Sequence, residues 1–67
     1  MTKGLYTVKI KFGLKTLLIC IDAENDEIFY ETLAAFEAVI GGEFVPGSIT
    51  YSTMLEIRPV PDPPKNH

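Results

Sequence analysis

Apolar and polar residues alternate near both ends of this chain, whereas the middle of the chain follows a helical period. Every second residue is apolar from Leu5 to Phe12, and the same two-residue period returns from Ile49 to Ile57. Such alternation is typical of strands with one buried face. Between Asp22 and Gly42 the apolar residues recur at spacings of three and four, which predicts one amphipathic helix.

The first two strands are expected to form a hairpin around Gly13-Leu14. A two-residue type II′ turn needs positive φ at its first central position, and glycine adopts that conformation without strain. This turn determines the register, and it places a buried set on one face: Tyr6, Val8, Ile10, Leu17, Ile19 and Ile21. The outer face then carries Leu18 and Cys20 beside Lys9 and Lys11.

The helix has clear candidate caps at both ends. Its start is open between Asp22 and Asn25, because both residue types are good N-caps. Gly41-Gly42 ends it with a residue that can take the left-handed conformation. The stripe expected to face the sheet is Phe29, Leu33, Phe36 and Ile40. We expect Phe36 to be buried against Ile10, Ile19 and Leu55.

The order strand, strand, helix, strand predicts a small α+β domain of ββαβ type over residues 1–58. One helix covers one face of a three-stranded, mainly antiparallel sheet. Two strand orders are possible, 2-1-3 and 1-2-3. We prefer 2-1-3, because fully antiparallel sheets tolerate one open face better than sheets with parallel pairs. Residues 59–67 are rich in proline and are predicted to be a flexible tail.

Size and composition restrict the class of protein. A chain of 67 residues is a single domain near the lower limit for folding without disulfides or metal. The five-residue apolar run Leu17–Ile21 is far shorter than the ~20 residues of a membrane helix. A single cysteine and no signal-peptide pattern favour a cytoplasmic location. We therefore expect a cytoplasmic protein without a membrane segment.

Charge is divided sharply along the sequence. Residues 1–21 carry bases and no acid, whereas residues 22–43 carry seven acids and no base, and the net charge is −3. Two explanations are open: attraction between hairpin and helix within the molecule, or a surface that docks a partner. The candidate partner-binding residues on the helix and just after it are Glu27, Tyr30, Glu31, Ala34, Glu37 and Glu43.

The function expected from this pattern is non-catalytic binding. We expect a regulator or inhibitor that docks a protein through the acidic helix, in the limit a nucleic-acid mimic of the kind used by phage antagonists. The alternative is a self-associating structural subunit, a homodimer formed through Leu18, Cys20 and Met54. A minor alternative is nucleic-acid binding through Lys9, Lys11 and Lys15. Single-strand binders stack bases on exposed aromatic rings, and the aromatic residues of these strands are expected to be buried.

Motifs for catalysis or metal binding are incomplete. Asp22, Glu24 and Asp26 have the spacing of a calcium loop, but the positions that require Gly and Glu hold Glu27 and Leu33. The sole histidine is the last residue of the Pro-rich tail, so no base is placed beside a nucleophile. We expect no enzyme activity, no metal site and no cofactor.

Overall fold

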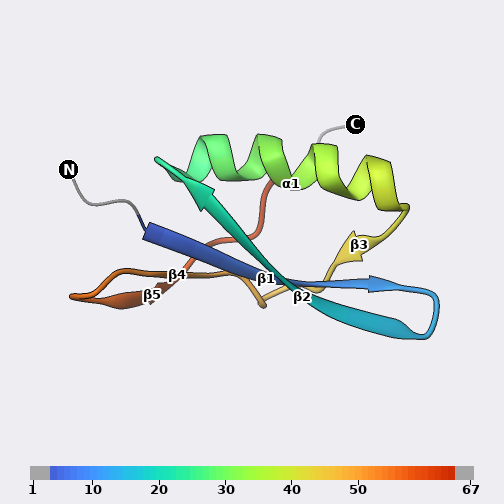
Figure 1. Ribbon diagram of the computed structural model, residues 1–67, viewed down its shortest axis with the longest axis horizontal. Coiled ribbons are helices and arrows are strands. Elements are labelled where there is room, and N and C mark those ends of the chain that lie inside the picture. The colour runs from blue at the N-terminus through green and yellow to red at the C-terminus, as the bar shows by residue number, and fades with distance from the viewer. Residues whose placement is uncertain (1–3, 65–67) are drawn as a thin grey trace.

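One helix lies across one face of a twisted antiparallel sheet (Figure 1). The computed structural model describes residues 4–64. The elements are β1 (Gly4–Phe12), β2 (Lys15–Ala23), α1 (Asp26–Ile40), β3 (Glu43–Phe44), β4 (Thr50–Ser52) and β5 (Ile57–Pro59). The predicted small α+β fold is therefore confirmed.

The sheet has five strands instead of the three that we predicted. Four strands follow the order β2-β1-β4-β5, and β3 pairs with β1 beyond β4 along the same edge. Every pair is antiparallel. The preferred placement of the first strand in the centre is correct, since β1 lies between β2 and β4.

The β1–β2 hairpin has the register predicted from its turn. Gly13 has a φ of 63°, and no non-glycine residue in the described part of the chain has positive φ. Pairing runs without a break from Phe12↔Lys15 to Gly4↔Ala23. The distal end of the hairpin extends past the helix (Figure 1). Nine strand residues span ~30 Å, whereas the 15-residue helix spans ~22 Å. Leu17 is consequently 44% exposed, although it was expected to be buried.

The two ends of α1 are capped by the residue types that the sequence suggested. Asn25 is the N-cap, and its side-chain oxygen accepts a hydrogen bond from the Ile28 amide at 2.9 Å. Gly41 ends the helix in the left-handed conformation with a φ of 75°, and its N–H donates to the Glu37 carbonyl. The start was open between two residues, and the structure selects the later one.

The core lies between α1 and β1. Its buried residues are Tyr6, Val8, Ile10, Ile21, Ala23, Phe29, Leu33, Ile49 and Val60. Phe29 occupies the centre, where its ring stacks on the Tyr6 ring with centroids 4.6 Å apart. Phe36 is only half-buried and packs at the edge of this cluster, so it is less buried than expected.

The predicted last strand, Ile49 to Ile57, is broken by a turn that forms the β4–β5 hairpin. Thr53 Oγ1 accepts hydrogen bonds from the amides of Leu55 and Glu56, both at 3.1 Å. The Thr53 amide in turn donates to the Glu56 carbonyl at 2.8 Å. A threonine hydroxyl that satisfies nearby amides competes with strand pairing. Leu55 and Ile57 are exposed as a result, and the expected contact between Phe36 and Leu55 cannot form.

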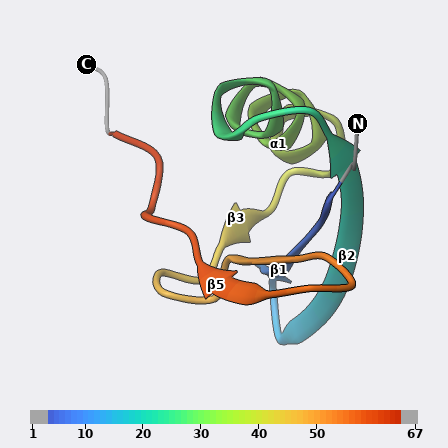
Figure 2. The ribbon, with the colours of Figure 1, turned by 90° about the vertical axis from the view of Figure 1, so that its left-hand side faces the viewer.

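The segment after β5 runs along α1 on the side away from β2 (Figure 2). Val60 is buried in the core, and its amide donates to the Ile49 carbonyl at 3.0 Å. The Gly47 amide donates to the Asp62 carboxylate at 3.0 Å. The predicted flexible tail began at residue 59, yet Pro59 ends β5 and Val60 belongs to the core. The remaining tail residues, 65–67, lie outside the described part of the chain.

Candidate interaction surfaces

A groove lies between α1 and the C-terminal segment, and we call it the α1 groove. It has a volume of about 290 Å³, and its lining residues are Glu27, Tyr30, Glu31, Ala34, Pro63 and Pro64. Four of these six residues belong to the partner-binding set predicted from the helix pattern. The two prolines were not predicted, because no local pattern in the sequence indicates that the tail packs beside the helix.

Tyr30 joins the two walls of the α1 groove. Its hydroxyl donates a hydrogen bond to the Pro61 carbonyl at 2.6 Å, which ties the C-terminal segment to the helix. Its ring lies 5.8 Å from the Phe29 ring, measured between centroids. Burial, together with the nearby carboxylates of Asp26 and Asp62, raises the pKa of the Tyr30 hydroxyl. The hydroxyl therefore stays protonated and holds the groove together at ordinary pH.

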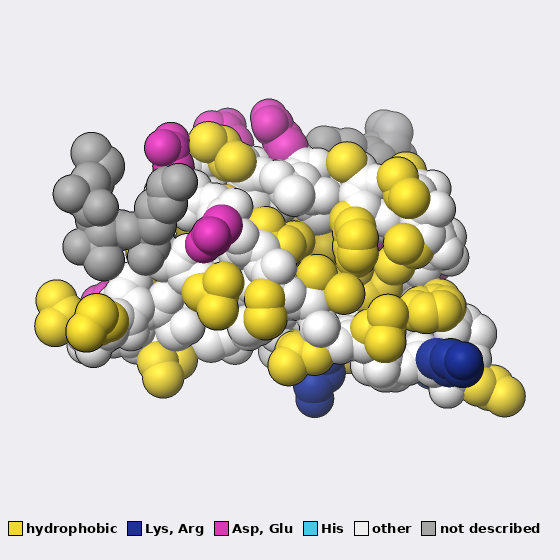
Figure 3. Space-filling view, viewed as in Figure 1, with side chains coloured by type: hydrophobic (Ala, Val, Ile, Leu, Met, Phe, Trp, Pro, Cys, Tyr) yellow, Lys and Arg dark blue, Asp and Glu magenta, His cyan; other side chains and the backbone are white. Residues whose placement is uncertain are grey.

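Two exposed acids, Glu27 and Glu31, border the α1 groove. They lie four residues apart on the helix, where two like charges destabilise it by about 0.2–0.5 kcal/mol. The single ion pair among residues 4–64 joins Arg58 to Asp26, so neither glutamate is neutralised there. Acidic side chains gather over α1 on the face seen in Figure 3, and basic side chains lie at the opposite edge. The division of charge along the sequence is thus also a division in space.

The other two acids of the predicted set lie apart from the α1 groove. Glu37 Oε2 accepts a hydrogen bond from the Phe44 amide at 2.7 Å, which fastens the end of α1 to β3. This hydrogen bond explains why an acid stands near the negative end of the helix dipole, and no binding partner is needed to explain it. Glu43 lies in β3 directly across from Lys11 in β1. Only half of the acids in the predicted set therefore line one concave surface.

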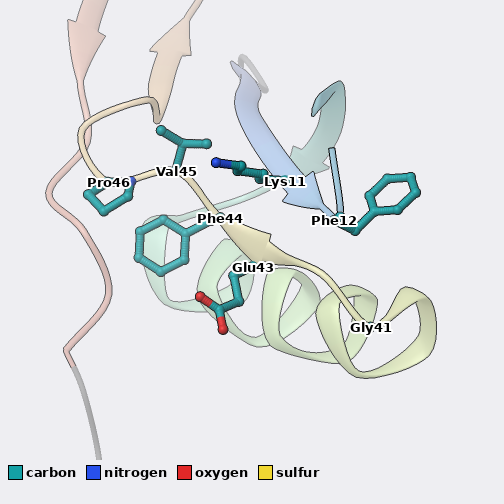
Figure 4. A pocket seen from close by; sticks show the side chains of 8 residues that line it. Lys11, Phe12, Gly41, Glu43, Phe44, Val45 and Pro46 are labelled. Atoms are coloured by element: carbon teal, nitrogen blue, oxygen red, sulfur yellow. The ribbon is translucent and has the colours of Figure 1, made fainter. Parts of the chain in front are cut away.

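A second groove, of about 490 Å³, lies where the hairpin extends past the end of α1. Its lining residues are Lys11, Phe12, Gly13, Gly41, Glu43, Phe44, Val45 and Pro46. The Lys11 and Glu43 side chains point in different directions and do not converge on a common point (Figure 4). Lys9 and Lys15, the other two predicted nucleic-acid contacts, are also exposed but do not line it. This arrangement offers no set of groups positioned for catalysis.

A polar network that sequence reasoning missed connects three elements. Asp26 Oδ1 accepts hydrogen bonds from the Tyr6 hydroxyl at 2.6 Å and from Arg58 Nη2 at 3.1 Å. The Arg58 guanidinium also lies over the Tyr51 ring, 4.5 Å from its centroid. Tyr6 is only 1% exposed, so a substrate cannot reach it. The network therefore ties β1, α1 and β5 together and has a structural role.

This environment changes the pKa of two groups in opposite directions. Burial, followed by the hydrogen bond and charge of Asp26, raises the pKa of Tyr6 to about 12. The hydrogen bond from Tyr6, reinforced by Arg58, lowers the pKa of the Asp26 carboxyl against the effect of burial. Folding therefore favours a neutral Tyr6 and an ionised Asp26.

We expect stability to fall at alkaline pH because Tyr6 must ionise. The pKa of Tyr6 is about 12 in the folded chain and 10.0 as the ordinary value. Its contribution is fully present below pH 10.0 and is lost as pH rises towards 12. This difference between the two pKa values corresponds to a loss of unfolding free energy on the order of 2–3 kcal/mol. Urea unfolding from pH 8 to about 12 measures this loss. Tyr6→Phe should flatten the decline, whereas Tyr51→Phe should leave it in place; equal slopes in both variants would contradict this assignment.

The predicted self-association residues do not form one patch. Leu18 and Cys20 are exposed neighbours on the outer face of β2. Met54 is 98% exposed in the β4–β5 turn, and β1 and β4 separate it from β2. The outer face of the sheet also carries Leu5 and Ile57, which were not predicted as surface residues and are 40% and 75% exposed.

Residues 4–64 contain no group of three or more His, Cys, Asp or Glu side chains that could hold a metal ion. No helix in that range is long and apolar enough to cross a membrane. Comparison of the chain with protein families, curated proteins and solved structures gives no significant match. Any functional proposal therefore has to come from the surfaces described above.

Proposed function

We propose that this protein is a non-catalytic interaction domain that docks a basic segment of a protein partner in the α1 groove. The observation that carries the proposal is the groove itself, in which apolar walls stand beside two acids that have no ion-pair partner among residues 4–64. Tyr30, Ala34 and the two prolines supply the walls, and Glu27 and Glu31 supply the charge.

A lysine or arginine side chain of the partner matches this chemistry. Its aliphatic stem packs against the proline and alanine surface, and its charged head reaches the glutamates. The Tyr30 ring adds a cation–π contact when the head lies over its face. Neutralising Glu27 and Glu31 also removes their mutual repulsion, which makes the bound state more favourable.

A regulator or inhibitor works in this way when the basic segment belongs to a working surface of the partner. Nucleic-acid mimicry is the extreme case, in which the partner is a nucleic-acid-binding protein. Charge complementarity of this kind speeds association and weakens it at high salt. Apolar contacts at Tyr30 would mainly slow dissociation, since aromatic residues ringed by polar ones often dominate binding energy.

Charge reversal tests the position of the binding surface. We expect Glu27→Lys/Glu31→Lys to lose the basic proteins that immobilised wild-type protein captures from an extract of its native host. The matched control is Glu24→Lys/Glu56→Lys, which changes net charge equally at two exposed sites outside the α1 groove. The control should retain the captured proteins. Recovery of the same proteins by the groove variant, or their loss from both variants, would contradict the proposal.

A further inference from the structure

The free edge of β2 is the longest unpaired strand edge in the described part of the chain. β2 stands at one end of the strand order, and β1 is its only partner there. It runs for nine residues without a bulge, since its pairing with β1 is continuous, and it contains no proline. Proteins usually protect such an edge with bulges, prolines, short strands or inward-pointing charges. Only Lys15, at the start of β2, resembles such protection.

The hydrogen-bonding groups on that edge belong to alternate residues. The backbone amide and carbonyl of Lys9 both point away from β2. The carbonyl accepts a hydrogen bond from the Val45 amide at 2.8 Å, and the amide donates one to Ser48 Oγ at 3.1 Å. Leu18 lies opposite Lys9, so its own amide and carbonyl point to the open side. The residues whose backbone groups have no strand partner within residues 4–64 are therefore Thr16, Leu18, Cys20 and Asp22.

We propose that a second copy of this chain occupies the β2 edge, forming an antiparallel β2–β2 pair about a two-fold axis at Ile19. This proposal concerns a different surface from the α1 groove and does not rest on the proposed function. The result is one sheet that is continuous across both copies, in which each copy contributes the same edge.

The register centred on Ile19 is the one that pairs all nine residues of the strand. It sets Leu18 opposite Cys20 of the second copy, and Thr16 opposite Asp22 of the second copy. On the outer face of the sheet, apolar residues thus face apolar residues, and polar residues face polar ones. A register that sets Cys20 opposite Cys20 of the second copy would instead place Leu18 opposite Asp22 and would pair fewer residues.

Charge complementarity favours a second copy over an unrelated strand. Thr16 pairs with Lys11 on its other side, and both side chains point to the outer face. Asp22 of the second copy then lies two strands from Lys11, about 10 Å between backbones, within reach of the lysine side chain. The two-fold axis repeats this attraction, so each copy supplies one base and one acid. Two separate features, the register and the charges, select the same pairing.

Analytical ultracentrifugation tests the assembly. We expect wild-type protein at high micromolar concentration to sediment with twice the chain mass, and Leu18→Glu to sediment with the mass of one chain. The new glutamate lies opposite Lys9 within its own chain, so the hairpin keeps a favourable cross-strand pair. Leu55→Glu makes the same change in the exposed β4–β5 turn and should remain dimeric. A monomeric wild type, or a dimeric Leu18→Glu, would overturn the proposal.

Disulfide trapping tests the register. In a hydrogen-bonded antiparallel pair the Cα atoms lie ~5.5 Å apart, a separation that a disulfide spans. Under mild oxidation Leu18→Cys should give dimers in which Cys20 of one chain is linked to position 18 of the other. Wild-type protein should give no Cys20–Cys20 link. Efficient linking of wild-type chains through Cys20 would refute the register. The α1-groove variant Glu27→Lys/Glu31→Lys should dimerise normally, so the two proposals can fail separately.

Discussion

Phe29→Ala is expected to remove most of the stability of the fold at room temperature. Phe29 is fully buried, and its ring stacks on the Tyr6 ring at the centre of the core. Replacing a buried Phe by Ala costs about 3–5 kcal/mol, because packing is lost and a cavity remains. A domain of this size has a total stability near the lower end of about 5–15 kcal/mol. The loss is therefore comparable to the total free energy of unfolding of the domain.

Urea unfolding followed by circular dichroism measures this effect. Phe36→Ala is the matched control, since it removes the same side chain from the same helix at a half-buried position. We expect Phe36→Ala to cost clearly less than Phe29→Ala. A larger loss of stability in Phe36→Ala than in Phe29→Ala would contradict the placement of the core centre at Phe29.

Asp26→Ala is expected to give the largest loss of any polar substitution, about 1–3 kcal/mol. The main cause is the Tyr6 hydroxyl, which would be left buried without an acceptor. The ion pair with Arg58 adds little, because the arginine side chain is 41% exposed and the surrounding water weakens the attraction.

Two further variants isolate this cause. Asp26→Asn keeps an oxygen for the Tyr6 hydroxyl and should cost less than Asp26→Ala. Glu27→Ala removes the other acid of the first helical turn, which is exposed and lies outside the network. It reports the loss of the helix-dipole interaction and the relief of the repulsion from Glu31, without any effect on Tyr6. Equal thermal stability of Asp26→Ala and Glu27→Ala would show that the network contributes nothing.

Local patterns were sufficient to predict the hairpin and the helix. The Gly13 turn determines the register of nine residue pairs, and the caps at Asn25 and Gly41 involve residues within a few positions of each other. Such features depend on short-range chemistry that a sequence displays directly. The acids and Tyr30 of the α1 groove follow from the same helical period.

Features that depend on distant residues were not predictable in this way. Alternation from Ile49 to Ile57 fits one long strand as well as a hairpin, and the Thr53 hydroxyl decides between them. The Arg58–Asp26 pair joins residues 32 positions apart. Val60 looked like part of a tail because prolines surround it, yet its side chain fills the core. The second wall of the α1 groove depends on that packing, which no local pattern contains.

Photo-crosslinking in the native host tests most directly whether the α1 groove is the docking surface. A photoreactive amino acid at position 34, where Ala34 is exposed in the groove, should yield a discrete adduct with a basic protein. The same amino acid at position 55, where Leu55 is 93% exposed in the β4–β5 turn, should not yield that adduct. Absence of an adduct from position 34, or the same adduct from both positions, would contradict the proposed docking surface.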